Sequence, residues 1–134
     1  MKLQQQQVKE FMRLAGQECP SEVKIPELNI CMLRYKLHEE EAVKELKDAF
    51  IKDSPVAALD SICDSLVVIL GTAVACGFSP EQVEAGFAEV MRSNMTKFID
   101  GHRRADGKWI KGPSYSPVNL QPIVDGKIAG GRQF

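Results

Sequence analysis

Apolar residues recur with a helical period along the first hundred residues of the chain. Residues 3–16 carry them at i, i+3, i+4 and i+7, which predicts an amphipathic helix that ends at Gly16. Similar spacing predicts further helices over 27–52, 56–77 and 80–98, and no sustained alternation typical of strands occurs. We therefore predict an all-α fold in which residues 1–100 form a four-helix bundle.

The chain changes character after residue 100. Asp100-Gly101 and Asp106-Gly107 are turn dipeptides, and the sequence from Val118 onward is rich in Pro and Gly. The stretch around the second dipeptide suits either a short hairpin or an extended arm. We predict an irregular C-terminal arm over 101–134 that packs on the helical domain or on a neighbouring subunit.

Two of the predicted helices carry more apolar surface than one small domain buries. The helix over 56–77 is apolar on nearly every side, which is typical of a helix inside a bundle or a membrane. Its longest apolar stretch, 66–78, is shorter than the ~20 residues that span a bilayer. The helix over 27–52 has two roughly opposite apolar faces. We therefore expect a homo-oligomer, either a homodimer or a dimer of dimers.

Composition narrows the class of partner and the compartment. The 134 residues carry a net charge of −1, so no overall field attracts nucleic acid or an anionic membrane, and neither is expected as a partner. The four cysteines form no C-x-x-C pair, which favours reduced thiols. The N-terminal segment has no apolar signal region, so we predict a cytoplasmic protein.

Acidic residues interrupt the core-facing lines of both long helices. Asp60 and Asp64 lie four residues apart, on one face of the apolar helix. Glu40 and Glu41, then Lys44 and Asp48, replace apolar residues along one stripe of the preceding helix, and Glu45 lies one turn after Glu41. A buried carboxylate without a partner costs several kcal/mol, so a positive group is expected beside these acids.

The short connection 52–55 predicts that the two helices pack antiparallel, which brings Glu41 and Glu45 level with Asp60 and Asp64. Facing carboxylates need cations, and carboxylate oxygens are ligands of Mg²⁺ and Mn²⁺. The chain has no P-loop motif, so phosphate binding would come through metal and basic side chains.

Two other interpretations of the acids stay open. A run of glutamates is usually a solvated face of a helix. Alternatively, the two aspartates pair with Lys44 or Arg34 in a purely structural oligomer. His38 precedes the run and is expected on the helix surface, pointing away from the acids.

Five stretches, in this order and spacing, resemble the MazG-like all-α nucleoside triphosphate pyrophosphohydrolases, above all a phage and bacterial subgroup. This family also includes phosphoribosyl-ATP pyrophosphohydrolase and the dimeric dUTPases. The stretches are FMRLAGQ (11–17), RYKLHEEEAVKEL (34–46), ALDSICDSLVVILGTAVACG (58–77), RSNMTKF (92–98) and DGKWIKGPSY (106–115).

The resemblance implies a role for each matching residue. The family holds Mg²⁺ with an E-E-x-x-E cluster on one helix and acids on the next. Its third acid position is Lys44 here, and the neighbouring Glu45 is expected to replace it. The implied residues are Glu40 and Glu41 for catalysis; Glu41, Glu45, Asp60 and Asp64 for metal; and Asn94 and Lys97 for substrate. Lys111 and Tyr115 are further substrate candidates from their chemistry. Lys111 either reaches a phosphate or belongs to a solvated basic arm, and Tyr115 either stacks on a base or pins the tail to the bundle.

The implied function is Mg²⁺-dependent cleavage of a (d)NTP to (d)NMP and pyrophosphate, with Mn²⁺ as a substitute metal and house-cleaning of the nucleotide pool as a role. Phosphoribosyl-ATP pyrophosphohydrolase-like activity is one alternative. A non-catalytic oligomer that binds nucleotide or metal is another. The sequence leaves the preferred base open.

Overall fold

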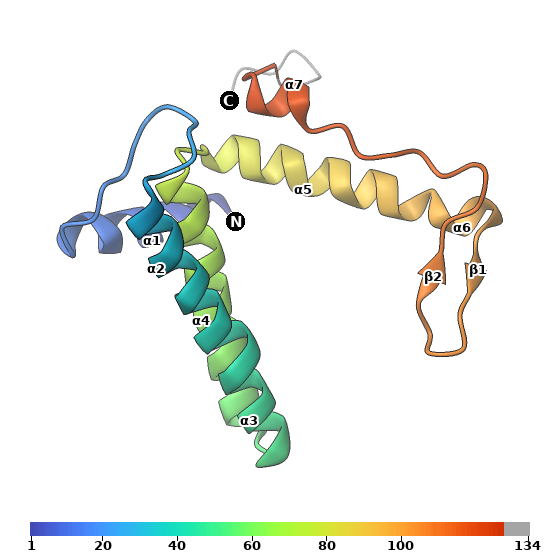
Figure 1. Ribbon diagram of the computed structural model, residues 1–134, viewed down its shortest axis with the longest axis horizontal. Helices are drawn as coiled ribbons and strands as arrows, with labels where there is room; N and C mark the ends of the chain where they lie inside the picture. The colour runs from blue at the N-terminus through green and yellow to red at the C-terminus, as the bar shows by residue number, and fades with distance from the viewer. Residues whose placement is uncertain (128–134) are drawn as a thin grey trace. The chain divides into compact units, whose positions relative to one another are not determined.

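The computed structural model describes residues 1–127 and is mostly helical, which confirms the all-α class (Figure 1). The chain forms two compact units, Met1–Pro80 and the residues from Glu81 onward. The four-helix bundle, the domain boundary at residue 100 and the oligomer stay predictions. Residues 128–134 of the predicted arm lie outside the described residues.

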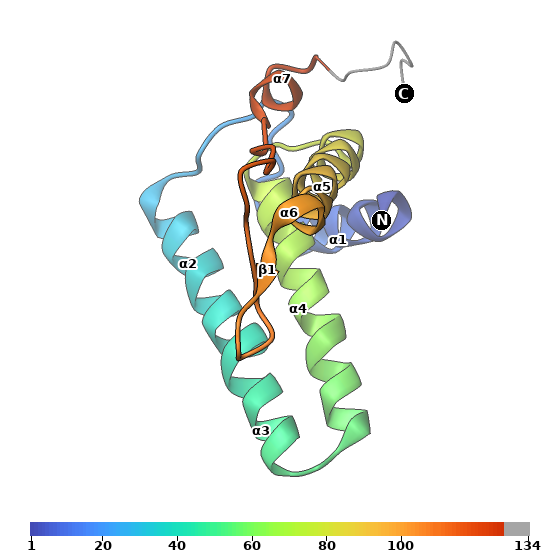
Figure 2. The same ribbon diagram turned by 90° about the vertical axis from the view of Figure 1, so that its right-hand side faces the viewer.

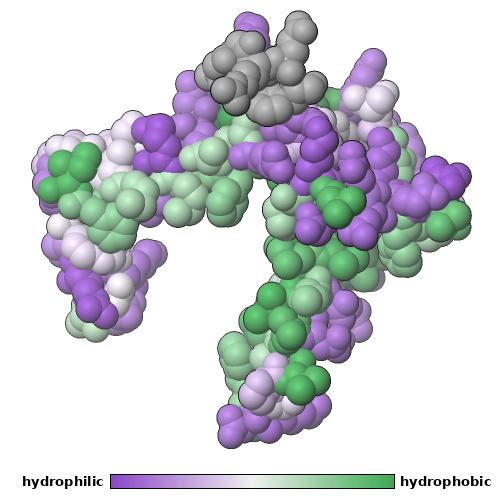
Figure 3. Space-filling model, turned by 180° about the vertical axis from the view of Figure 1, so that it is seen from behind, coloured by the Kyte–Doolittle hydropathy of each residue, from purple (hydrophilic) through white to green (hydrophobic). Residues whose placement is uncertain are grey.

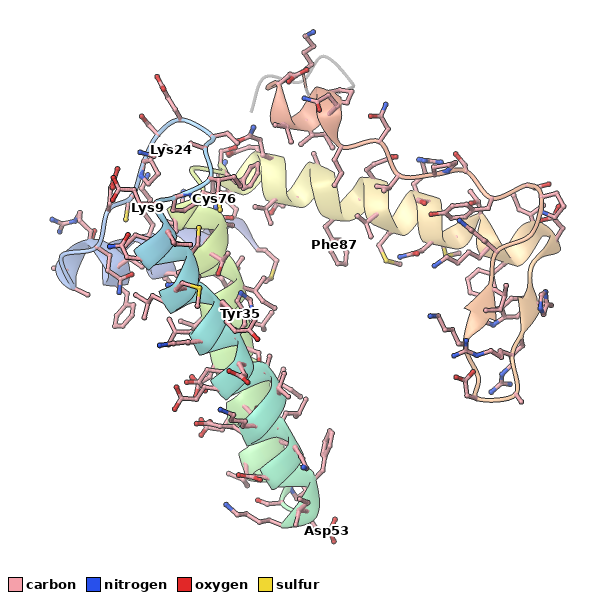
Figure 4. The ribbon with its side chains drawn as sticks, viewed as in Figure 1. Lys9, Lys24, Tyr35, Asp53, Cys76 and Phe87 are labelled. Carbon is pink, nitrogen blue, oxygen red and sulfur yellow. The ribbon has the colours of Figure 1, made fainter. Side chains whose placement is uncertain are left out.

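The first unit is built on a long helical hairpin. Helix α2 (Leu28–His38), the π-helical segment η1 (Glu39–Glu45) and α3 (Leu46–Ile51) follow one another as one rod. Helix α4 (Pro55–Ala75) returns alongside them (Figure 2). Asp53 lies at the tip of the connection with a φ of 50° (Figure 4). The predicted antiparallel pairing is therefore observed, although η1 interrupts the continuous α-helix expected over 27–52.

Local signals account for both ends of α4. The hydroxyl of Ser54 accepts a hydrogen bond from the Ala57 N–H at 3.2 Å, and proline occupies the first helical position. Gly77 follows the helix with a φ of 77°, and a side chain there would also collide with the carbonyl of Glu22. The Lys24 N–H donates to the Cys76 carbonyl at 3.0 Å. The connector before α2 is thereby held against this end of α4.

The core of the first unit lies where α1 (Lys2–Leu14) crosses the C-terminal half of α4 (Figure 2). Val8 and Met12 of α1 pack against Leu70, Val74 and Ala75 of α4, and all five are buried. The Gln5 side chain adds a hydrogen bond from Nε2 to the Phe78 carbonyl at 2.8 Å. This end of the hairpin is anchored by α1, and the opposite end is not.

Much of the apolar surface of α4 remains uncovered within its own unit (Figure 3). Leu59, Ile62 and Leu66 are 62%, 48% and 40% exposed. By length and composition α4 could cross a membrane, and 22% of its most apolar window is buried, but core helices of soluble proteins pass the same test. The expected all-round burial of this helix therefore requires surface from outside the unit.

The second unit contains α5 (Pro80–Met95), α6 (Lys97–Asp100), the antiparallel strands β1 (His102–Arg103) and β2 (Trp109–Ile110), and α7 (Gln121–Val124). Of the two forms that the sequence left open for this stretch, the structure has the hairpin. Phe98 packs edge-on against Trp109, with ring centroids 4.9 Å apart.

The chain after β2 is held against α5. Buried Ser93 donates to the Ser116 carbonyl at 2.8 Å, and the Glu89 carboxylate accepts from the Asn119 N–H at 2.9 Å. Arg92, bonded to the same carboxylate, and the Asn119 N–H lower the pKa of Glu89 to about 2. The predicted arm is therefore less irregular than expected, since it contains the strands and α7.

Candidate functional site

Glu41, Glu45 and Asp64 come together between the two long helices. One carboxylate oxygen from each lies within 4.8 Å of the other two. The glutamates come from η1 and the aspartate from α4. Glu41 is half-buried, and its Oε2 is fully buried without a hydrogen-bond partner. This acidic triad is the arrangement that the antiparallel packing of the two helices predicts.

The π-helical segment aligns the two glutamates. Each π-type bond reaches the fifth carbonyl back, so one turn holds about one residue more than an α-turn. The residue at position i+4 then lies almost directly above the residue at position i, on the same side of the helix. The residue at position i+3 does not complete the turn and points to a different side. Glu45 consequently faces the same way as Glu41, and Lys44 does not. The hydroxyl of buried Ser61 donates to the Glu41 carbonyl at 2.9 Å, which ties the segment to α4.

The other two predicted acids lie outside the triad. Asp60, one turn before Asp64 on α4, is exposed and is not among the three clustered residues. Glu40 is also exposed, and its negative charge is one of the influences that raise the pKa of Glu41. The structure therefore brings Asp64 together with Glu41 and Glu45, and a place for Asp60 beside them stays a prediction.

Burial is the largest cause of a raised pKa at Glu41, followed by the negative charges of Glu45 and Asp64. A hydrogen bond with Glu45 acts in the same direction. A divalent cation bound among these carboxylates would compete with a proton on Glu41.

No ion pair neutralises the acids within residues 1–127. The described ion pairs join other residues, and neither Asp60 nor Asp64 meets Lys44 or Arg34 in one. The interpretation in which these aspartates form structural salt bridges therefore lacks the contact it requires.

A cavity of about 390 Å³ adjoins the triad between α1, α2 and α4. Glu41 and Asp64 line one part of it. Arg34 and Gln17 line another part of the cavity. Arg34 lies seven residues before Glu41, which corresponds to about 10 Å along a helix. Most of the remaining wall is apolar: Val8, Phe11, Met12, Leu33, Leu37, Val67 and Val68.

Sequence reasoning missed how Arg34 is held. The residue is only 7% exposed, and its side chain donates from Nη2 to the Val68 carbonyl at 2.8 Å and from Nε to Thr72 Oγ1 at 3.2 Å. His38 is half-buried with Nε2 at 3.0 Å from the same hydroxyl, so its predicted surface position is wrong. A side chain at Gly71 would collide with the guanidinium. The adjacent Gly-Thr inside an apolar helix was the available signal.

The predicted substrate residues all lie in the second unit. Lys97 Nζ donates to Asn94 Oδ1 at 2.8 Å, and Lys111 Nζ lies 5.0 Å from the centre of the Tyr115 ring. The Tyr115 hydroxyl lies 3.1 Å from Ser93 Oγ and donates to it, because the Ser93 proton is used on the Ser116 carbonyl. The structure groups these residues with one another, and their part in substrate binding stays a prediction.

A scan against models of known protein families finds no match, and a search of curated proteins finds no similar sequence. The resemblance to the MazG-like family consequently rests on the five stretches alone.

We predict that Asp64→Asn leaves the metal-free protein as stable as the wild type or more stable. The change removes a negative charge from three close carboxylates and keeps the shape of the side chain. Thermal unfolding in the presence of a chelator measures the effect. Asp60→Asn is the matched control and should change the melting temperature little. A large drop in the melting temperature of Asp64→Asn would contradict this prediction. It would correspond to a loss of the ~3–5 kcal/mol in unfolding free energy that follows when a buried ion pair is broken.

The raised pKa of Glu41 predicts the pH dependence of metal-free stability. Between the ordinary and the raised pKa the folded state binds more protons than the unfolded state, so stability falls as the pH rises through this range. Glu41→Gln removes this dependence. Urea unfolding over a pH series should show equal stability at acidic pH and a growing advantage of the variant towards neutral pH, with Glu39→Gln as control. A pH-independent difference would argue against it.

Proposed function

We propose that the protein is a divalent-cation-dependent nucleoside triphosphate pyrophosphohydrolase, which cleaves a (d)NTP between the α- and β-phosphates to give (d)NMP and pyrophosphate. The observation that carries this proposal is the acidic triad, with one orphaned buried carboxylate oxygen, beside a cavity of about 390 Å³. Pockets of about 300–1,000 Å³ are typical of small-molecule sites.

The donor set fits the metal that the resemblance implies. Glu41, Glu45 and Asp64 offer only carboxylate oxygens, which suit Mg²⁺ or Mn²⁺ and leave positions for water and phosphate oxygens. The bound metal would neutralise charge on the phosphates and lower the pKa of an attacking water. Asp60 as a further ligand stays part of the proposal, without support from the triad.

The π-helical segment supports the resemblance to the MazG-like family. The family's E-E-x-x-E spacing places its third acid at Lys44, and a one-residue offset in the sequence puts Glu45 there instead. The wider turn of η1 accommodates one additional residue, so Glu45 stands in line with Glu41. The chain thereby keeps three clustered acids despite the altered spacing.

The protein's own residues would divide the work between water activation and substrate binding. Glu40 or Glu41 orients the water and accepts its proton, and Lys97 and Lys111 neutralise phosphate as point charges. Tyr115 and Asn94 contribute to the nucleotide site. All these roles belong to the proposal.

The proposal includes a homo-oligomer, a homodimer or a dimer of dimers, in which helices of two copies complete a bundle. The uncovered apolar surface of α4 supports it, together with Tyr35 and Val43 on the other rod, each 61% exposed. A second copy of the same hairpin offers matching apolar helices. The cytoplasm as the compartment is part of the same proposal.

A pyrophosphate-release assay over canonical NTPs and dNTPs with Mg²⁺ tests the function. We expect monophosphate and pyrophosphate in equal amounts, without release of the γ-phosphate alone. Glu41→Gln should lower the rate by about a hundredfold or more, because it removes a metal ligand and a proton acceptor. Glu39→Gln, an exposed change on the same segment, should retain activity.

Two outcomes would contradict this function. Release of orthophosphate instead of pyrophosphate would point to different chemistry. Absence of turnover with every nucleotide, with Mg²⁺ binding intact by calorimetry, would favour the non-catalytic alternative.

A further inference from the structure

One charged group in the cavity has no part in the chemistry proposed for the acidic triad. Arg34 lines the cavity wall away from the triad, and the residue is buried, with an exposed fraction of 7%. No carboxylate among residues 1–127 pairs with it. A buried cation without an acidic partner is unusual and calls for a further acceptor.

The guanidinium is held in one orientation before any ligand arrives. Nη2 donates to the Val68 carbonyl and Nε to the Thr72 hydroxyl. That hydroxyl uses its single proton on the Val68 carbonyl at 2.9 Å, so it accepts from both Arg34 and His38 Nε2. The missing side chain at Gly71 leaves the space that the guanidinium occupies. The arrangement is preorganised.

Nη1 of Arg34 makes no hydrogen bond to the residues that the structure describes and, unlike Glu41 Oε2, is not fully buried, so it can donate to a ligand in the cavity. A guanidinium has more donors than the two used here and has no acceptor of its own. A ligand part that satisfies them must present oxygen or ring-nitrogen lone pairs. The apolar residues Phe11, Leu33 and Leu37 line the same cavity and suit the faces of a flat ring.

We propose that Arg34 reads the base of the nucleotide and selects bases with a keto oxygen at the edge remote from the sugar. The inference rests on the proposed function, which places the phosphates at the acidic triad. The sugar then faces the triad, and position 4 of a pyrimidine or position 6 of a purine points towards Arg34. The ~10 Å of helix between Glu41 and Arg34 matches the reach of a nucleoside.

The group at position 4 of the pyrimidine or position 6 of the purine decides which bases Arg34 prefers. A keto oxygen accepts from the guanidinium, as in the pairing of arginine with guanine O6 and N7. An amino group in its place would turn its own N–H donors towards those of Arg34, so the exocyclic position would offer no acceptor. Uracil, thymine, guanine and hypoxanthine should therefore be preferred over cytosine and adenine.

A second cavity also borders Arg34, but it does not adjoin the acidic triad. It measures about 580 Å³ and is lined by the connector before α2. None of the three clustered acids lines it, so a nucleotide held at the triad has its base in the smaller cavity. Lys24, which lines the larger cavity, already pairs with Glu18 at 3.1 Å.

Matched substrate pairs test the inference. dUTP and dCTP differ at position 4, and dITP and dATP differ at position 6, with little change in size. We expect kcat/KM with Mg²⁺ to favour the keto member of both pairs by about tenfold or more. Arg34→Lys keeps the charge but loses the planar fork, so turnover should persist while both ratios fall towards one. Arg13→Lys, an exposed arginine on α1, should leave the ratios unchanged.

Binding of monophosphates gives a readout that does not depend on catalysis. Calorimetry should show tighter binding of dUMP than of dCMP to the wild type, and this difference should be lost in Arg34→Lys. Failure to hydrolyse any triphosphate would refute the proposed function, and the dUMP and dCMP affinities would still decide the base preference.

Several results would overturn the inferred base preference and leave the proposed function standing. Equal kcat/KM or equal affinity for both members of a pair in the wild type would do so, and so would a preference for the amino member. A loss in Arg34→Lys that is the same for every substrate, with the ratios retained, would show that Arg34 only supports the fold. If that variant does not fold, the wild-type ratios and affinities decide.

Discussion

Electrostatic repulsion among Glu41, Glu45 and Asp64 is the constraint on which the rest of the first unit depends. Like charges within 4.8 Å of one another destabilise a fold unless a proton or a cation intervenes. The hairpin nevertheless brings them together, and Glu41 retains a buried oxygen without a partner. Groups of residues that destabilise the folded state in this way are typical of functional sites.

The surrounding structure keeps the acids in place without the help of salt bridges. Ser61 ties the π-helical segment to α4 through the Glu41 carbonyl, and the short connection at Asp53 sets the pairing of the two rods. The apolar core at the α1 end supplies the packing that offsets the repulsion. At the other end, α4 leaves apolar surface uncovered, so the site lies between an anchored and an unanchored part of the hairpin.

Periodicity and loop length predict the regular part of this structure and fail where the helical turn itself changes. The helical class, the antiparallel pairing and the meeting of Asp64 with Glu41 can all be derived from residue spacing and a short loop. An α-helix brings both i+3 and i+4 near position i, so spacing alone did not separate Lys44 from Glu45. Nor did it predict the bonds that link Arg34 and His38 to Thr72, because polar contacts between residues far apart in sequence leave no period.

The central claim is that the acidic triad binds one divalent cation, and a calorimetric titration with Mn²⁺ tests it most directly. We expect one site per chain in the wild type, with a proton released on binding where the pH lies below the raised pKa of Glu41. Glu45→Gln should weaken binding by about tenfold or more, while Lys44→Gln should not weaken it. Equal affinity of Glu45→Gln and the wild type, or no Mn²⁺ binding at all, would contradict the claim.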